Sequence, residues 1–477
     1  MRQEFKKLVR ASSSVLPPSS PNPFKRCLKR LLTILRKMLG NSLSRQLKRQ
    51  HHGKLSVGFF VPTPGFEGNF GELPLELDRR GFITVWLYGT SQAYEKSLEK
   101  RKLLITGGMV SKLTGFHAIV TASVMDCLPT GVVRVLHDHI SYAHFDIEPL
   151  VQNLLRGDER IDAVFHTKQE LFGKMSAFVA FLPFYDLILS SSKPVTDLSV
   201  RSLNFSGYDT GKRAAQVFER LDYKSIENLV EVSDYRKKIR VVQSGYCKLD
   251  SKIKKYSCLA PDKVIVFAPT PNDLSGNKSG ALWQDNMTVN VYAAELLEAL
   301  CCNFNDYKIV FKPYKDELES LISTVSDKLK AYTNFETDMC GSNYWPLYSR
   351  AKILISDFSS TAYTFALGVG RPVVFFSPNE RNLSARFVES SFCKSRKEVG
   401  VIATSVIEVI SAINTVLVNY DEFISKVDDF RKRNNASGNA ASLAADAISD
   451  LIEARRSGLK ESPKYEFIEL KKVGQYD

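Results

Sequence analysis

The stretch that decides the fold is KILISDFSSTAYTFALGVGRPVVFF, which runs from Lys352 to Phe376. Its apolar residues Ile353 to Ile355 predict a buried strand, and the polar residues Ser356 to Ser360 predict a turn. A short helix, a glycine-rich stop and a second apolar strand follow. This order predicts one βαβ unit of a parallel sheet, with the polar turn at the carboxyl end of its first strand.

The start of this helix is suited to an anion. Ser359, Ser360 and Thr361 open the helix at the end where backbone N–H groups are free and the helix dipole is positive. These two features favour a bound phosphate group. Gly368 and Gly370 end the helix before the next strand. The alternative is an ordinary capped helix, because Asp and Ser are common capping residues.

The length and the charge divide the chain. Its 477 residues predict two compact domains with tails, because single hydrophobic cores rarely grow beyond about 250–300 residues. The net charge is +13. Residues 1–54 hold fourteen Lys or Arg and one acid, Glu4, and therefore account for all of it. The basic character belongs to the N-terminal segment alone.

That segment predicts a membrane-binding helix. Residues 11–23 are rich in Ser and Pro, and we expect them to be disordered. Residues 24–54 place leucines at spacings of three, four and seven among bases, a pattern typical of an amphipathic helix. The bases expected to contact an anionic membrane, at roughly 1 kcal/mol each, are Lys25, Arg26, Lys29, Arg30, Arg36 and Lys37. The alternatives are packing against the body and nucleic-acid binding, which the sparse aromatics disfavour.

Targeting and cysteine content indicate a protein at the cytoplasmic face of the membrane. The longest apolar run, residues 177–189, contains Pro183 and Asp186 and is too short to span a bilayer. The N-terminal segment does not resemble a secretory signal, because charges interrupt its apolar runs. The eight cysteines form no CxxC pair, which predicts reduced thiols and no zinc site. We therefore expect peripheral attachment from the cytoplasm.

The remaining sequence predicts two doubly wound α/β domains that face each other across a cleft. In the first domain, strands are predicted at residues 55–61, 82–89, 117–122, 132–136, 162–167 and 186–191, and residues 236–256 predict a last strand followed by a turn and a basic crossover. In the second domain, strands are predicted within residues 262–273 and 307–317, at 353–355 and after Pro372, with helices between them. The predicted divisions are a disordered and basic segment at 1–53, an acceptor domain at 54–250, a nucleotide-donor domain at 251–405, and C-terminal helices with a tail at 406–477.

Polar residues just past the strand ends are the candidate site, because ligands of open parallel sheets bind there. In the second domain they are Thr270, Asn272, Asp273, Lys312, Tyr314, Lys315 and the residues Asp357 to Thr361. In the first domain they are the 62–71 loop, His137, Asp138, His139 and His166. A histidine at a strand end could act as a general base, although a structural role is the alternative. The alternating His137 and His139 do not make a metal site, which needs three or four convergent ligands.

These motifs resemble the CDP-glycerol glycerophosphotransferase family, the teichoic-acid and capsule polymerases. FAPT, then FKP, then ISDFSSTAYTFALGVGRPVVFF follow the order of the family's C-terminal half. SGYCKLD (244–250) is similar to the turn before its nucleotide-binding domain, and YDLILSSS (185–192) to a strand of its first domain. The resemblance covers about residues 130–380 and is most specific over 240–380. It implies the GT-B fold and attachment to the inner membrane face through basic amphipathic segments.

The resemblance also assigns roles to residues. It implies that His137 deprotonates the acceptor hydroxyl, although Asp138 stands where the family has glycine. The family's second histidine follows Lys-Pro and contacts the donor phosphate, but here Tyr314 occupies that place. Tyr314 and Lys315 could supply a hydrogen bond and a charge. The replacement of the family's second histidine by Tyr314 points either to a different donor, such as a CMP-linked acid sugar, or to a degenerate site.

The predicted function is therefore a GT-B transferase of cell-surface polymer synthesis (capsule, teichoic acid or O-antigen). It would move a glycerol-phosphate-like or sugar unit from a cytidine nucleotide to a lipid-linked or polysaccharide acceptor. Thr270, Lys312, Tyr314, Asp357, Ser359, Ser360 and Thr361 would hold the donor. We expect no cofactor, no metal and no nucleic-acid partner. The sequence leaves open whether the protein forms a homo-oligomer. The alternatives are a non-catalytic subunit of a polysaccharide assembly complex and an enzyme resembling GT-B nucleotide-sugar 2-epimerases.

Overall fold

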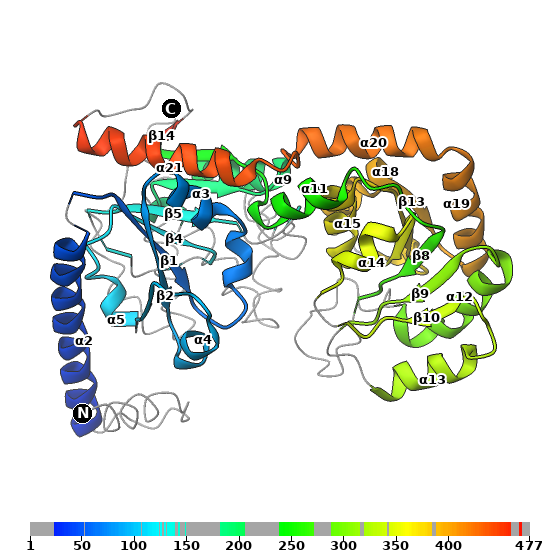
Figure 1. The fold of residues 1–477 in the computed structure, drawn as a ribbon, viewed down its shortest axis with the longest axis horizontal. Helices are drawn as coiled ribbons and strands as arrows, with labels where there is room; N and C mark the ends of the chain where they lie inside the picture. Colours follow the sequence, from blue (N-terminus) through cyan, green and yellow to red (C-terminus); the bar gives the residue numbers. More distant parts are fainter. Residues whose placement is uncertain are drawn as a thin grey trace.

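Two parallel sheets, each packed between helices, form the body of the protein (Figure 1). The computed structural model describes residues 23–51, 53–105, 107–123, 125, 128–129, 131–138, 142–143, 148, 182–205, 238–270, 288–314, 319–340, 343–383, 388–458 and 467–469. The two sheets lie in separate halves of the molecule, and helices of the C-terminal region lie along both halves (Figure 1).

The first sheet has the strand order β14-β7-β6-β5-β4-β1-β2-β3. Its strands are β1 (Ser56–Val61), β2 (Ile83–Tyr88), β3 (Lys102–Leu104), β4 (Ala118–Thr121), β5 (Val133–His137), β6 (Leu187–Ser190), β7 (Lys238–Gln243) and β14 (Phe467–Glu469). All pair in parallel except β14, which is antiparallel to β7. Its central strands are fully buried, as the long apolar runs predict.

The second sheet has the order β10-β9-β8-β11-β12-β13 and is parallel throughout. Its strands are β8 (Val264–Phe267), β9 (Lys308–Phe311), β10 (Phe335–Thr337), β11 (Ile353–Ser356), β12 (Val373–Phe376) and β13 (Gly400–Ala403). Alternate residues of each strand enter different cores. Ile353 and Ile355 pack with α12 (Val289–Asn303) and α19 (Val406–Val418) on one face, whereas Leu354 packs with α15 (Thr361–Val369) and α20 (Tyr420–Arg433) on the other.

The helices that cover the sheets are as follows: α2 (Pro23–Gln50), α3 (Leu73–Arg79), α4 (Ser91–Lys96), α5 (Gly107–Val110), α9 (Lys193–Phe205), α11 (Asp250–Tyr256), α12 (Val289–Asn303), α13 (Glu319–Leu329), α14 (Trp345–Arg350), α15 (Thr361–Val369), α17 (Ser391–Lys394), α18 (Arg396–Val399), α19 (Val406–Val418), α20 (Tyr420–Arg433) and α21 (Ala440–Arg456). Among the described helices, none combines the length and the hydropathy needed to cross a bilayer.

The C-terminal helices return the chain to the first half. α20 lies over the second sheet, and α21 continues back along the first (Figure 1). Asp250 fixes the start of α21, since its two carboxylate oxygens accept from the backbone N–H groups of Ala440 (3.1 Å) and Ala441 (2.7 Å). The turn before α21 also contacts Gly245, which has φ +88°. A Cβ on Gly245 would lie 2.4 Å from the Asn435 carbonyl oxygen, so only glycine fits there.

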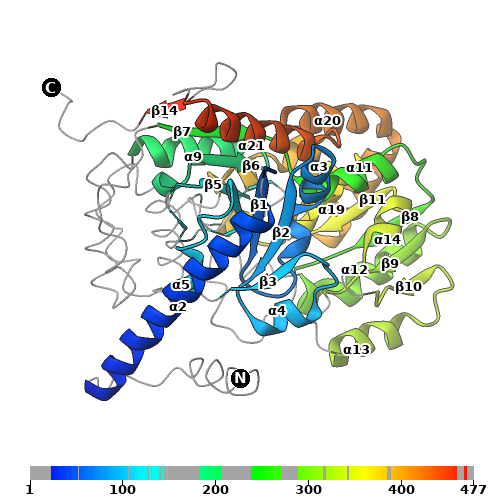
Figure 2. The same cartoon turned by 60° about the vertical axis from the view of Figure 1, so that its left-hand side comes forward.

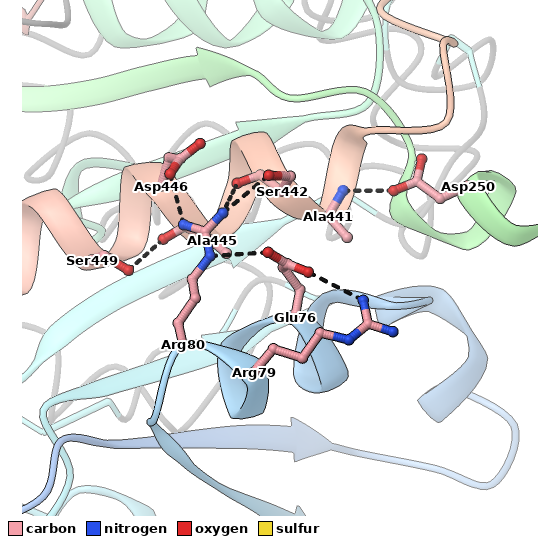
Figure 3. A network of polar contacts seen from close by, with 9 residues as sticks. All are labelled: Glu76, Arg79, Arg80, Asp250, Ala441, Ser442, Ala445, Asp446 and Ser449. Carbon is pink, nitrogen blue, oxygen red and sulfur yellow. Dashed lines mark hydrogen bonds and ion pairs between the residues drawn. The ribbon is translucent and has the colours of Figure 1, made fainter.

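Arg80 holds the middle of α21 against α3 (Figure 3). Its guanidinium donates to the carboxylate of Asp446 (2.6 Å) and the hydroxyl of Ser442 (3.0 Å). Glu76, one turn earlier on α3, accepts from the Arg80 Nε at 3.0 Å. These hydrogen bonds join residues more than 350 positions apart in sequence, and they fix α21 against the first half of the molecule.

The N-terminal helix is present where the leucine spacing predicts it. Its second half packs on the first domain: Leu47 is buried, and a Cβ on Gly40 would lie 2.8 Å from the Met109 carbonyl oxygen of α5. Its first half extends away from the body (Figure 2). There Leu31, Ile34, Leu35, Met38 and Leu39 are exposed. The alternative prediction, that this helix packs against the body of the protein, is therefore correct only for the second half of α2.

The structure confirms the α/β class and two mostly parallel sheets. Four short strands, β3, β10, β13 and β14, were not predicted. The predicted strand at 162–167 lies outside the described residues, as does most of the Ser/Pro-rich stretch.

Candidate active site

The three predicted polar clusters of the second domain meet at one sheet edge. β8 pairs with β9 on one side and with β11 on the other, so their carboxyl ends are adjacent. Thr270 follows β8, Lys312 follows β9 and Asp357 follows β11. Asn272, Asp273 and Lys315 lie outside the described residues. The edge therefore gathers a lysine, hydroxyls and a carboxylate, as the strand pattern predicts.

Asp357 is the buried centre of this edge. One of its carboxylate oxygens accepts from the Thr270 N–H (2.8 Å) and hydroxyl (2.5 Å). The other accepts from the Thr288 hydroxyl (3.0 Å) and N–H (3.4 Å), just before α12. Burial raises the pKa of Asp357, while these hydrogen bonds oppose the shift. Both oxygens are committed to the protein, so Asp357 ties the ends of β8 and β11 to α12.

The residues that open α15 lie at the same edge. Ser360 is the N-cap residue, and the helix begins at Thr361. The Thr361 N–H donates to the Ser359 hydroxyl (3.3 Å), and the Thr361 hydroxyl lies 2.6 Å from the Tyr348 hydroxyl. Ser360 is exposed and Ser359 is partly exposed. The amino end of a nine-residue helix is thus open to solvent, where an anion can approach its backbone N–H groups.

The end of α15 follows the glycine signal in its sequence. Gly370 is in the left-handed region (φ +75°), and its N–H donates to the Ala366 carbonyl. Arg371 is buried, and it donates to the carbonyl oxygens of Ser349 (2.8 Å) and Ala351 (2.6 Å). The glycine and arginine therefore stop the helix and anchor the start of β12.

Lys312 and Tyr314 differ in their exposure to solvent. The Lys312 side chain is nearly buried, and its Nζ donates to the Asp338 carbonyl oxygen (3.2 Å) and lies 3.8 Å from the Asp338 carboxylate. Tyr314 is about half exposed, at 48 %. Lys312 thus brings a positive charge to the edge with its Nζ beside Asp338, whereas the Tyr314 ring reaches solvent.

His137 ends β5 in the first sheet. It is buried, and its ring lies 5.8 Å from the Phe70 ring, in the loop that follows β1. Asp138 accepts from the Ser191 hydroxyl (2.7 Å), just past β6. Burial and the nearby Asp138 raise the pKa of Tyr246. The carboxyl ends of β1 and β5 therefore lie at one edge, as predicted, and the residues after β6 join them. His139, His144 and His166 lie outside the described residues.

The segment after β5 docks on the second domain. Tyr142 stacks on Tyr363 of α15, with ring centroids 4.2 Å apart, and its hydroxyl donates to the Ser395 hydroxyl (2.6 Å). Glu148 accepts from the N–H (3.1 Å) and the hydroxyl (2.6 Å) of Ser391, at the start of α17. His137 and the α15 helix thus belong to two sheet edges that are linked through these side chains.

Sequence reasoning missed Tyr142, Glu148 and Thr288. Each of these residues forms a hydrogen bond with a residue 69 or more positions away in sequence, and no local sequence motif identifies such a pair. Tyr363, in contrast, belongs to the deciding stretch, where its helical position predicts only burial.

The remaining candidate residues lie on α2. The structure describes no side chains for Lys25, Arg26, Lys29 and Arg30, whereas Lys37 is exposed and Arg36 partly so. For metals, no group of three or more His, Cys, Asp or Glu suited to hold an ion occurs within the described ranges.

Comparisons with known proteins agree with the fold. The solved structure of the Wall Teichoic Acid Polymerase TagF aligns over 91% of this chain and 100% of that chain, with 13% identity and a TM-score of 0.50. Its H548A structure aligns over 91% of this chain and 98% of that chain, with 15% identity and a TM-score of 0.50. No curated protein sequence matches the chain. At such low identity these likenesses establish the architecture, and the GT-B fold is confirmed.

The fold and the sequence match together define the class, which is a GT-B-type transferase. Residues 233–452 match the model of the family described as CDP-Glycerol:Poly(glycerophosphate) glycerophosphotransferase. The resemblance found in the motifs is therefore confirmed for residues 233–452, which include α15.

Proposed function

We propose that the protein transfers a glycerol-phosphate-like or sugar unit from a cytidine-nucleotide donor to a lipid-linked or polysaccharide acceptor in cell-surface polymer synthesis. The observation that carries this proposal is the open amino end of α15, which lies at the same sheet edge as Lys312 and Thr270, within the segment that matches the family. This edge offers N–H groups, hydroxyls and one positive charge, a set that suits a pyrophosphate linkage.

The proposed chemistry follows from the two edges. For a glycerol-phosphate unit, the acceptor hydroxyl oxygen bonds to the donor's distal phosphorus while the bond from that phosphorus to the bridging oxygen breaks. CMP leaves with the electron pair, and the acceptor proton passes to His137. The α15 amides and Lys312 stabilise the charge that develops on the leaving phosphate. Ser359, Ser360, Thr361 and Tyr314 orient the donor, and Asp357 positions Thr270. No cofactor beyond the donor is required.

His137 must become accessible for this role. It is 1 % exposed and packs near Phe70. We therefore infer that the loop carrying Phe70 moves when the acceptor binds. A base that is covered until the acceptor arrives would also protect the donor from water.

We further propose peripheral attachment to the cytoplasmic membrane face through α2. The exposed side chains Leu31, Ile34, Leu35 and Met38 would enter the lipid boundary, and the bases would meet anionic headgroups. This places the site near a lipid-linked acceptor.

The test is a thermal-shift screen with CDP-glycerol, CDP-ribitol, CMP-sugars and UDP-sugars, followed by a transfer assay with the donor that binds. A cytidine donor should stabilise the protein, since a ligand at one hundred times its Kd adds about 2.7 kcal/mol to the free energy of unfolding. Stabilisation by no cytidine compound would overturn the proposal. That result would favour a non-catalytic subunit, for which the Tyr314 replacement is the supporting observation.

A further inference from the structure

A pocket lies at the opposite edge of the first sheet from His137. Its volume is about 510 Å³, within the range of roughly 300–1,000 Å³ typical of ligand sites. Its wall includes residues beside the amino ends of β1, β4 and β5, whereas His137 follows the carboxyl end of β5. Residues at the carboxyl ends of α2 and α21 line the pocket together.

Six basic side chains line this pocket, from three separate parts of the chain. They are Lys48 at the end of α2, His51 and Lys54 in the link to β1, His117 before β4, and Arg455 and Arg456 at the end of α21. No Asp or Glu occurs among the described residues of its wall. Outside the wall, Asp186 pairs with Arg455 at 2.7 Å. Within the described ranges, Lys54 and Arg456 have no carboxylate within 4 Å.

Helix termini alone do not account for this cluster. Bases in the last turn of a helix commonly offset its dipole, which would explain Lys48, Arg455 and Arg456. Lys54, His51 and His117 lie outside helices, yet they face the same space.

The histidine pKa values agree with a positive local field. Burial and then Arg456 lower the pKa of His117, and burial and then Arg101 lower the pKa of His51. The Nδ1 atom of His117 accepts from the Ser56 N–H at 3.1 Å, so the neutral ring carries its proton on Nε2. A neutral His117 can therefore donate a hydrogen bond without bearing charge.

We propose that this pocket is a second ligand site, distinct from the transferase site, and that it binds a phosphate group. The phosphate belongs either to a membrane lipid headgroup or to a soluble phosphate compound. Lys54 and Arg456 supply charge at the rim, and His117 supplies a donor on the wall. Because α2 ends at this pocket, a headgroup bound here would hold the first domain close to the membrane.

The test uses the full chain and two probes, inorganic phosphate in solution and vesicles of phosphatidylcholine with 30 % phosphatidylglycerol. The pocket variant is Lys54→Gln with Arg456→Gln. The matched control is Lys96→Gln with Lys330→Gln, which removes two exposed lysines elsewhere. All four side chains are exposed, so folding should survive, and thermal unfolding checks this.

We expect the pocket variant to bind one of the probes at least tenfold more weakly than the control. Loss in the phosphate titration identifies a soluble ligand, and loss only with vesicles identifies a lipid headgroup. Equal binding of the pocket variant and the control to both probes would overturn the proposal. Loss of phosphate binding in Ser359→Ala but not in the pocket variant would also overturn it, because the phosphate would then occupy the α15 site.

Discussion

At the scale of single residues, Asp357 and His137 have different relations to the proposed reaction. Asp357 is satisfied within the protein by four hydrogen bonds from Thr270 and Thr288, so its effect on a donor passes through Thr270. His137 ends its strand beside Phe70, at the edge linked to the donor domain. Of these two residues, we propose His137 as the one that exchanges a proton with a substrate, once the loop carrying Phe70 has moved.

Replacing His137 by alanine should lower the rate of transfer roughly 10²-fold or more, which is typical for loss of a general base. The affinity for CDP should stay unchanged, because the donor edge lies in the other sheet. A transfer assay with calorimetry checks both values. Wild-type turnover in His137→Ala would contradict the assigned role.

Asp250 should make stability depend on pH in an unusual direction. Burial raises its pKa from 3.8 to about 6, so the folded state binds the proton more tightly than the unfolded state. Its contribution is therefore greatest below about pH 4 and declines as the pH rises to about 6. A rise of the pKa from 3.8 to about 6 corresponds to roughly 3 kcal/mol.

Asp250→Asn removes this titration and keeps one acceptor for the start of α21. From pH 4 to pH 7 the stability of wild type relative to the variant should fall by up to about 3 kcal/mol. Thermal unfolding of both proteins at the two pH values measures the difference. A difference that is independent of pH would show that Asp250 is not titrating in this range.

At the scale of elements, α2 combines two functions along one helix. Its second half packs on the first domain through Gly40, against α5, and Leu47, against Gly115, whereas its first half exposes Leu35 and Met38. Burial of one part only is what a membrane-binding extension of a folded domain requires.

Replacing Leu35 and Met38 together by serine should reduce co-sedimentation with anionic vesicles at least tenfold, because roughly 1.5–3 kcal/mol is lost for each apolar side chain that no longer enters lipid. The matched control replaces Leu75 and Leu98, two exposed leucines outside α2. Equal loss in both double variants would mean that exposed apolar area in general, rather than α2, drives binding.

The same scale shows how far sequence predicts the fold. The central strands were found because both of their faces are buried, which gives continuous apolar runs. β3 and β10 were missed because each has only three residues and none of them is fully buried. The edge that holds Thr270, Lys312 and Asp357 followed from strand ends alone. The fourfold bonding of Asp357 could not be predicted, because Thr288 lies 69 residues away.

At the scale of the whole molecule, the two halves are joined by side chains that follow β5. Tyr142 and Glu148 reach from the His137 edge to α15 and α17. A second connection lies between α21, which packs on the first sheet, and α11, whose first residue, Asp250, accepts a hydrogen bond from the Ala441 N–H. Such contacts fix how the two sheet edges face each other, and sequence pattern carries no signal for them.

Tyr142→Ala should remove the stack on Tyr363 and cost about 3–5 kcal/mol of stability. Tyr142→Phe keeps the stack and loses only the Ser395 hydrogen bond, at about 1 kcal/mol. We expect kcat for transfer to fall at least tenfold in the alanine variant and much less in the phenylalanine variant, with CDP affinity retained in both. Equal kcat in both variants would exclude a role for the stack in aligning the two edges.

The central claim is that the donor phosphates bind the backbone N–H groups at the start of α15, and Ser360 allows a direct test. Its φ of −59° suits proline, so Ser360→Pro removes one N–H, whereas Ser360→Ala keeps it. Calorimetric titration with CDP should give similar affinities for wild type and Ser360→Ala, and at least tenfold weaker binding for Ser360→Pro, with thermal unfolding confirming the fold. Wild-type affinity in Ser360→Pro, or no CDP binding by the wild type, would contradict the account.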